Sequence, residues 1–238
     1  MTRPVEQASA LATALTSLGA HVVVYPTIAL GPPPSWEPFD RAVSALGDYA
    51  WLVFTSPSAV RFATERAPGL RDALVAPAAP RVAAVGTETA RALRERGMPV
   101  AIVPDDQRQE GLVDALDALS PGTRVLFPQA LGGRELLVEA LVERGVVVDV
   151  VPISRTRALP LVDAPPFFDV ATFASPSALR AFVTARGTAA LDGKVVAVIG
   201  PTTAAAARAA GVAIGVMAAQ PSVTALVAAL AGFRATMG

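Results

Sequence analysis

Hydroxyl-bearing residues follow the ends of several apolar segments, and each group stands just before a helix-like segment. The groups are Thr-Ser-Pro-Ser at 55–58, Gly-Thr-Glu-Thr at 86–89, Ser-Pro-Ser at 175–177 and Gly-Pro-Thr-Thr at 200–203. Ser and Thr at such positions cap free backbone N–H groups, and Pro suits the first helical turn. Helix N-termini also attract carboxylates and phosphates. The pattern therefore predicts either ordinary helix caps or a set of anion-binding loops.

Residue types used by most catalytic sites are scarce. The chain has no cysteine, His21 is its single histidine and Lys194 its single lysine. Disulfides, thiolate metal sites and cysteine nucleophiles are therefore excluded. No dinucleotide-binding, P-loop or nucleophile-elbow motif occurs. We interpret Asp105, Asp106 and Glu110 as a solvated loop, and we expect neither a metal nor a cofactor.

The amino-acid composition limits the kinds of partner that the protein could bind. Among 238 residues, 20 basic side chains balance 20 acidic ones, so no broad electrostatic field recruits nucleic acid or anionic lipid. Apolar residues make up 53%, but the longest apolar segment, 195–219, contains Pro201 and Arg208 and is too interrupted for a membrane span. The N-terminus lacks a signal-peptide pattern. We expect a cytoplasmic protein with no nucleic-acid or membrane partner.

Short Val- and Ala-rich runs alternate with amphipathic segments, which is typical of α/β folds with buried parallel strands. Several helix-like segments end at a glycine, the usual stop signal. The expected helices cover 7–19, 87–97, 134–145 and 202–211. The expected strands cover 21–28, 50–55, 81–86, 100–104, 124–128, 146–153, 169–174, 194–200 and 213–218.

The chain repeats itself. FTSPSAVRF at 54–62 recurs as FASPSALRAF at 173–182, the segment 82–103 recurs at 196–217, and 11–26 matches 137–152. These matches indicate a duplicated α/β unit. The repeat also predicts a strand like 124–128 ahead of 7–19, and the sequence begins at Met1 without one. Either the start is assigned too late or that sheet lacks a strand. Proline-rich stretches at 31–38 and 157–166 are typical of linkers and frame a middle segment.

The order and spacing of these motifs resemble the uroporphyrinogen-III synthase family over nearly the whole chain. The motifs are TRP at 2–4, FTSPSAV at 54–60, VGTETARAL at 85–93, FASPSAL at 173–179, IGPTTA at 199–204 and PSVTAL at 221–226. The resemblance implies two parallel-sheet α/β domains joined by a two-stranded linker, with a cleft between them. One domain would combine 1–30 with 160–238, the other would span 36–155, and the linkers would be 31–35 and 156–159.

The resemblance also implies a cofactor-free lyase that acts as a monomer. Its substrate would be hydroxymethylbilane, a linear tetrapyrrole with eight carboxylates. The family cyclises it to uroporphyrinogen III, with loss of water and inversion of ring D. Positioning and electrostatic stabilisation would suffice without a strong base.

Carried onto this sequence, the family site implies a set of hydroxyl, glycine and arginine residues around the substrate. The set is Arg3, Thr55, Ser56, Ser58, Gly86, Thr89, Arg134, Ser175, Ser177, Gly200, Thr202 and Thr203. We interpret Arg3 and Arg134 as anion clamps in equivalent halves, with plain surface arginines as the alternative. Many relatives carry a tyrosine where this chain has Ser154, so the catalytic group is unassigned and Ser154→Tyr is expected to be tolerated.

Two other classes of protein remain open from the residues alone. A catalytically silent tetrapyrrole-binding or regulatory module would fit Ser154 and the short N-terminus. A solute-binding receptor with a hinged cleft is the third reading. Thermal stabilisation by tetrapyrrole, but not by sugars or amino acids, separates the ligand classes.

Overall fold

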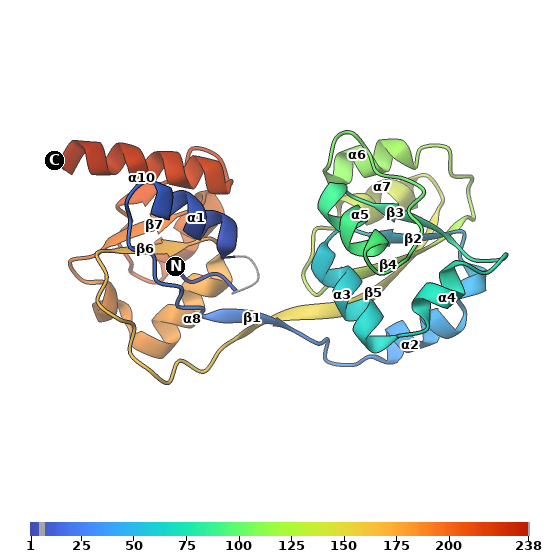
Figure 1. Cartoon of the computed structure of the whole chain (residues 1–238), viewed down its shortest axis with the longest axis horizontal. Coiled ribbons are helices and arrows are strands. Elements are labelled where there is room, and N and C mark those ends of the chain that lie inside the picture. Colours follow the sequence, from blue (N-terminus) through green and yellow to red (C-terminus); the bar gives the residue numbers. More distant parts are fainter. Residues whose placement is uncertain (5–7, 238) are drawn as a thin grey trace. The chain divides into compact units, whose positions relative to one another are not determined.

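The computed structural model describes residues 1–4 and 8–237, and it divides into two compact units. Unit 1 combines residues 1–30 with 156–238, and unit 2 comprises residues 31–155. The chain therefore crosses between the units twice, once after Leu30 and once after Arg155. Figure 1 follows these crossings along strands β1 (Ile28–Gly31) and β5 (Val147–Ala158), which are neighbours in one sheet.

Unit 2 contains most of a five-stranded sheet with the order β1-β5-β4-β2-β3, in which most of β1 and the last residues of β5 come from unit 1. Its remaining strands are β2 (Trp51–Phe54), β3 (Arg81–Ala84) and β4 (Arg124–Ala130), and β2 pairs in parallel with both β3 and β4. Its helices are α2 (Glu37–Ser44), α3 (Pro57–Arg66), α4 (Leu70–Leu74), α5 (Thr87–Arg94), α6 (Gln109–Ala115) and α7 (Leu136–Glu143), with a 3₁₀ turn at Leu46–Asp48.

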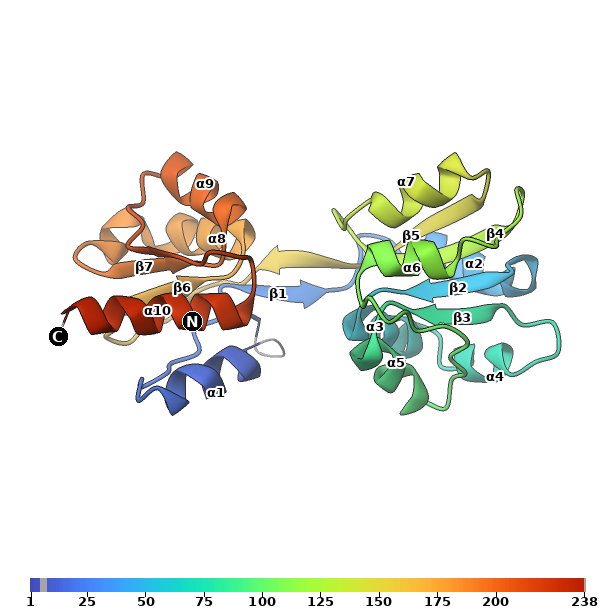
Figure 2. The same ribbon diagram turned by 90° about the horizontal axis from the view of Figure 1, so that it is seen from above.

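Helices cover both faces of this sheet, as Figure 2 shows for α7 on one side and α3 and α5 on the other. Trp51 and Val53 pack with the residues of α6 and α7. Leu52 and Phe54 alternate with them along β2 and are also buried. Burial on both faces explains the uninterrupted apolar run that identifies this strand in the sequence.

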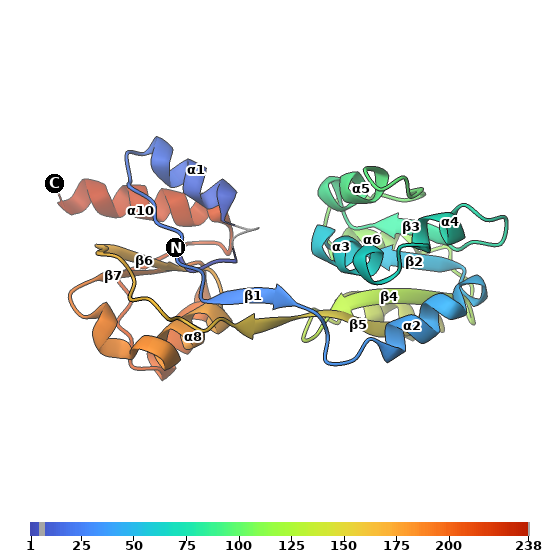
Figure 3. The same ribbon diagram turned by 60° about the horizontal axis from the view of Figure 1, so that its bottom comes forward.

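Unit 1 is built on a three-stranded parallel sheet with the order β6-β7-β8. The strands are β6 (Val170–Phe173), β7 (Val195–Val198) and β8 (Val216–Met217). The helices are α1 (Ser9–Ser17), α8 (Pro176–Arg186), α9 (Pro201–Ala209) and α10 (Val223–Met237), with a 3₁₀ turn at Thr188–Leu191. Figure 3 shows α1 and α10 on one face of the sheet and α8 on the other.

The internal repeat is visible in the element order, since β2-α3-β3-α5 in unit 2 corresponds to β6-α8-β7-α9 in unit 1. The helix stops predicted at Gly19, Gly97, Gly145 and Gly211 are confirmed, because all four have positive φ.

Three predicted strands are shorter than expected. Of 21–28 only Ile28 is in a regular strand, 100–104 contributes a single bridge from Ile102 to Ala83, and 213–218 keeps only β8. A strand needs a partner as well as an apolar run, and the described backbone partners of residues 21–27 are limited to Met1, Thr2 and Leu159. The proline-rich 31–38 is also not wholly linker, since α2 begins at Glu37 with Pro38 in its first turn.

One buried hydroxyl in unit 1 is unsatisfied. Thr172 is 3% exposed, and its Oγ1 has no hydrogen-bond partner among the described residues. The repeat places the fully buried Val53 at the corresponding position of unit 2. Thr172→Val is therefore expected to raise the free energy of unfolding of unit 1 by about 1 kcal/mol, measured by urea denaturation. The reverse change, Val53→Thr, should destabilise unit 2, and a loss of stability in Thr172→Val would show that the hydroxyl has a partner.

Candidate carboxylate-binding site

Four helices begin at the carboxyl ends of parallel strands. In unit 2, α3 follows β2 and α5 follows β3; in unit 1, α8 follows β6 and α9 follows β7. Helices α3 and α5 pack together, and so do α8 and α9. Each unit therefore presents two helix N-termini side by side at one edge of its sheet, where open α/β sheets bind ligands.

The first helix of each pair is capped by its own serine. Ser56 Oγ accepts a hydrogen bond from Ala59 N at 3.1 Å, and Ser175 Oγ accepts one from Ala178 N at 3.2 Å. Ser56 Oγ also lies 3.1 Å from Ser58 Oγ. Capping thus accounts for Ser56 and Ser175, and their hydroxyls already have a partner. Thr55, Ser58 and Ser177 are half-buried beside these caps.

The second helix of each pair begins at a glycine and has no side-chain cap on that residue. Gly86 precedes α5 and Gly200 precedes α9. Three residues later stand Thr89 and Thr203, each 2% exposed. A first turn of this kind leaves backbone N–H groups available to a ligand.

Helix α5 is closed by a residue that the sequence patterns miss. Gln107 Oε1 accepts hydrogen bonds from Thr87 N at 2.9 Å and from Thr87 Oγ1 at 3.0 Å. A Cβ at Gly86 would lie 2.7 Å from that oxygen, so glycine permits the close approach. Glu88 adds a negative charge to the same turn. No sequence motif predicts that Gln107 binds the start of α5, because Gln107 lies in a loop 20 residues further along the chain.

Helix α9 is open by comparison. Its first residue, Pro201, has no N–H, so the first free donors are the backbone N–H groups of Thr202 and Thr203. Thr202 is exposed, while Thr203 packs into the unit. The first turn of α9 contains no acidic residue. The two halves are therefore not equivalent as anion sites: unit 1 holds the open helix N-terminus.

The two candidate arginines, Arg3 and Arg134, also differ between the two units. Arg3 lies with Ser175 and Pro4 around a cavity of about 50 Å³. Its Nε is buried without a hydrogen-bond partner among the described residues, and burial lowers the pKa of Arg3. The guanidinium still remains charged at any physiological pH. An anion placed beside it would gain a charge-assisted hydrogen bond.

Arg134, by contrast, is already paired. Its Nη2 lies 2.6 Å and its Nη1 3.2 Å from the two carboxylate oxygens of Glu110, and this pairing holds the pKa of Glu110 below its usual range. The repeat also places Gln129, not Arg134, at the position of Arg3. The two arginines therefore differ in their surroundings, and at the position of Arg3 unit 2 has the neutral amide of Gln129. That Arg3 and Arg134 bind anions stays a prediction.

Ser154 lies within β5 and is 1% exposed, and its carbonyl oxygen accepts a hydrogen bond from Leu131 N at 2.8 Å. A tyrosine at this position would have to displace packed neighbours. Contrary to the sequence-based expectation, Ser154→Tyr should destabilise the protein by about 1–3 kcal/mol. Thermal unfolding measures this, with Ser154→Ala as a control that adds no volume. An unchanged melting temperature in Ser154→Tyr would show that the position has room.

A tyrosine with a raised pKa lies away from the loops at the helix N-termini. Burial, together with the neighbouring Asp149 carboxylate, raises the pKa of Tyr49 to about 12. The guanidinium of Arg124 lies 4.7 Å from the centre of the Tyr49 ring. Arg124 and Asp149 belong to the amino-terminal parts of β4 and β5, opposite the ends where the helices begin. This cluster joins strands, and its phenol stays protonated at neutral pH.

Two absences hold for residues 1–4 and 8–237. No three His, Cys, Asp or Glu side chains there form a group that could hold a metal ion. None of the helices in that part of the chain is long and apolar enough to cross a membrane.

Known proteins resemble this chain in sequence and in fold. Residues 9–228 match the family described as Uroporphyrinogen-III synthase HemD. A uroporphyrinogen-III synthase from Synechococcus elongatus is 35% identical over 158 residues, which cover 66% of this chain but only 59% of that relative. One from Chlorobaculum parvum is 30% identical over 91% of both chains.

Solved structures support the fold. The uroporphyrinogen-III synthetase of Helicobacter pylori matches with a TM-score of 0.63 at 19% identity, over 91% of this chain and 96% of that one. A mutant Thermus thermophilus uroporphyrinogen III synthase matches with a TM-score of 0.53 at 22% identity, over 98% and 96%. The predicted α/β fold with two parallel sheets is therefore confirmed. With the match over residues 9–228, the chain belongs to the uroporphyrinogen-III synthase HemD family.

Proposed function

We propose that the protein is a uroporphyrinogen-III synthase that converts hydroxymethylbilane to uroporphyrinogen III. The observation that carries this proposal is that unit 1 contains both an open helix N-terminus, at α9, and a guanidinium, that of Arg3, whose buried Nε has no hydrogen-bond partner among the described residues. Helix N-termini and guanidinium groups both favour carboxylates in proteins, and the proposed substrate carries eight of them. Net neutrality of the chain is compatible with this, because the positive potential is local.

The proposed reaction requires little acid–base catalysis by the protein. The hydroxyl group of the bilane leaves with a proton as water, while the pyrrole nitrogen supplies the electron pair that forms an azafulvene cation. The substituted carbon of ring D attacks that cation to give a spiro intermediate. Cleavage and re-formation of the bond at the spiro centre inverts ring D, and loss of a proton restores the pyrrole.

In this scheme the chain's residues bind and orient. The first-turn N–H groups of α9 and the guanidinium of Arg3 would hold carboxylates, which fixes the fold of the bilane and favours attack through ring D. The carboxylates held by these donors would place negative charge near the developing cation. We leave the group that protonates the departing hydroxyl unassigned, since Ser154 is buried in β5.

The test is a product assay. Fresh hydroxymethylbilane is supplied to the protein, the products are oxidised, and uroporphyrins I and III are separated by chromatography. We expect a clear excess of type III over an enzyme-free reaction, which yields type I. Type I alone, from protein shown to be folded, would refute the proposal and support the second candidate, a silent tetrapyrrole-binding module, which Ser154 favours. Monomeric state and cytoplasmic location remain predictions.

A further inference from the structure

The end of β5 forms an exposed two-stranded ribbon with β1. Pairing of β5 with β4 ends at Ser154, and beyond it β5 continues beside β1, its other neighbour in the sheet (Figure 1). Leu159 N donates to Thr27 O at 2.9 Å, which continues this pairing past the end of β5. Residues 155–158 are all exposed. Because successive side chains of a strand point to opposite faces, both faces of the ribbon are open to solvent.

Two arginines share one face of this ribbon. Arg155 and Arg157 are two positions apart in β5, so their side chains point to the same side, and Thr156 points to the other. Positions two apart along a strand are separated by about 6.6 Å. Both arginines belong to one strand, so this spacing is set by β5 itself. A pair of guanidinium groups therefore stands side by side on an open surface.

The positive charge of this pair is not compensated locally. Neither Asp nor Glu occurs in the segment 22–36, which contains β1, or in the segment 150–162, which contains the end of β5. In the described part of the chain neither guanidinium forms an ion pair. Arg124 of β4, by contrast, pairs with Asp149 of β5. Like charges on one face of a strand repel each other, and a ligand with two negative charges would relieve that repulsion.

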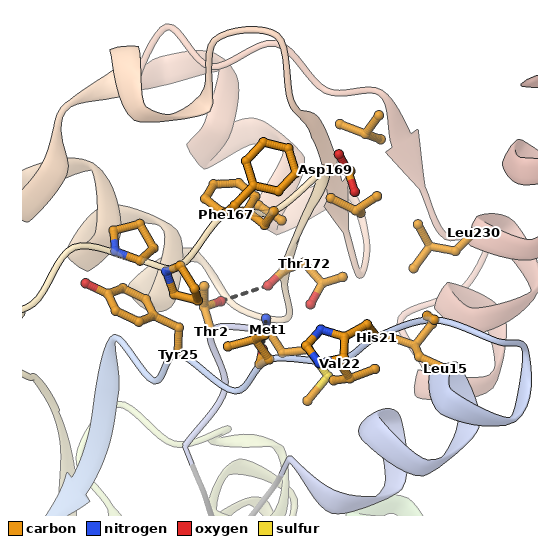
Figure 4. Close-up of a pocket in the computed structure, with 18 of the residues that line it drawn as sticks. Met1, Thr2, Leu15, His21, Val22, Tyr25, Phe167, Asp169, Thr172 and Leu230 are labelled. Atoms are coloured by element: carbon orange, nitrogen blue, oxygen red, sulfur yellow. Dashed lines mark hydrogen bonds between the residues drawn. The ribbon is translucent and has the colours of Figure 1, made fainter.

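The groove of unit 1 does not offer a comparable site for carboxylates. This groove, of about 640 Å³, is lined mainly by apolar side chains such as those of Leu15, Phe167 and Leu230 (Figure 4). Asp169 is among the described residues that line it, and none of those residues is an arginine or a lysine. A carboxylate in this groove would meet a like charge and no cationic side chain. Additional carboxylate contacts are therefore better sought at the exposed arginines of β5.

We propose that Arg155 and Arg157 form a two-point site that binds both carboxylate arms of one pyrrole ring of the substrate. This inference rests on the proposed function, since hydroxymethylbilane carries two carboxylate arms on neighbouring carbons of each pyrrole ring. A guanidinium binds a carboxylate through two parallel hydrogen bonds. Two guanidiniums on one face of a strand fit two carboxylates that a planar ring holds together. A ring with a single carboxylate would leave one arginine unpaired, so the site selects paired carboxylates.

The experiment exchanges two neighbouring residues of the full chain. Arg155→Thr combined with Thr156→Arg keeps composition and charge but moves one guanidinium to the opposite face of β5. Equilibrium dialysis under reducing conditions compares uroporphyrinogen I, which has two carboxylate arms on each ring, with coproporphyrinogen I, in which one arm of each ring is a methyl group. We expect the exchange to weaken binding of uroporphyrinogen I at least about 10-fold and that of coproporphyrinogen I no more than about threefold.

A second pair of variants separates geometry from net charge. Arg155→Gln with Arg157→Gln should weaken uroporphyrinogen I binding at least as much as the exchange does. Arg41→Gln with Arg71→Gln removes the same charge from exposed positions on α2 and α4 and should change that binding by no more than about threefold. Thermal unfolding of each variant verifies that it is folded.

The proposal is overturned if the exchange variant binds uroporphyrinogen I as tightly as the parent, or if it loses affinity for both tetrapyrroles equally. Equal losses in the two charge-removing variants, or no measurable binding by the parent, would also overturn it. The product assay on the parent separates this result from the proposed function. Type III product with unchanged binding in the exchange variant would refute the two-arginine site alone. Type I product with the expected binding pattern would refute the synthase activity and leave the site standing.

Discussion

Thr202→Glu is expected to lower kcat/KM for hydroxymethylbilane by about 100-fold or more without destabilising the fold. Thr202 is exposed in the first turn of α9, where backbone N–H groups have no partner within the helix. A glutamate there would repel a substrate carboxylate, and like charges in such proximity cost several kcal/mol. The same glutamate suits a helix N-terminus and should add about 0.3–1 kcal/mol of stability. Kinetics and thermal unfolding on one preparation measure both effects.

Unit 2 offers the matched control for this variant. Glu88 stands at the position of Thr202 in the repeat and pairs with Arg91 at 2.7 Å. Since Gln107 already occupies the start of α5, Glu88→Thr should leave kcat/KM within a few-fold of the parent. Full activity of Thr202→Glu would remove α9 from the substrate site. Comparable losses in both variants would instead indicate that the two helix N-termini contribute alike.

Arg3→Gln is expected to reduce kcat/KM about 10- to 100-fold, which corresponds to a charge-assisted hydrogen bond of ~1.5–3 kcal/mol. The variant copies Gln129, the residue at the corresponding position of unit 2. Because the buried Nε of Arg3 has no hydrogen-bond partner in residues 1–4 and 8–237, removal of the guanidinium should not lower the free energy of unfolding. A loss of activity at unchanged stability therefore separates substrate binding from a structural role.

Arg134→Gln is the control for this second prediction. Its guanidinium is engaged by Glu110, so its loss should change kcat/KM little. If Arg3→Gln retains the parent's kcat/KM, or if it melts well below the parent, the assignment of Arg3 as a carboxylate-binding residue is contradicted.

The architecture was largely predictable because its signals are local. Strands buried on both faces give continuous apolar runs such as that of β2, and helix ends give glycines such as Gly97. The strands that failed to form, above all 21–27, depend on a neighbour, and no property of their own residues reveals whether that neighbour is present. Whether a segment pairs as a strand therefore depends on the whole sheet and not on the segment alone.

The position of the candidate site was predictable from the sequence. The difference between the two units at this site was much less predictable. The hydroxyl-rich turns locate the helix N-termini, yet they do not show which termini are already satisfied. Gln107 reaches α5 from a distant loop, and Glu110 engages Arg134 across 24 positions. Such long-range partners are set by tertiary packing, so repeated motifs suggested an equivalence that the contacts of Arg3 and Arg134 do not support.

The insertion of unit 2 within unit 1 fixes an order of assembly on the ribosome. All residues of unit 2 are synthesised before β6, β7 and β8, so unit 2 can fold before the sheet of unit 1 is complete. Pairing of β1 with β5 then brings the two crossings together. This shortens the loop that must close when the C-terminal residues arrive, and so lowers the entropy cost of that step. A ribosome stalled after unit 2 has left the exit tunnel, but before β7 and β8 have emerged, would therefore carry a folded unit 2 and an incomplete unit 1.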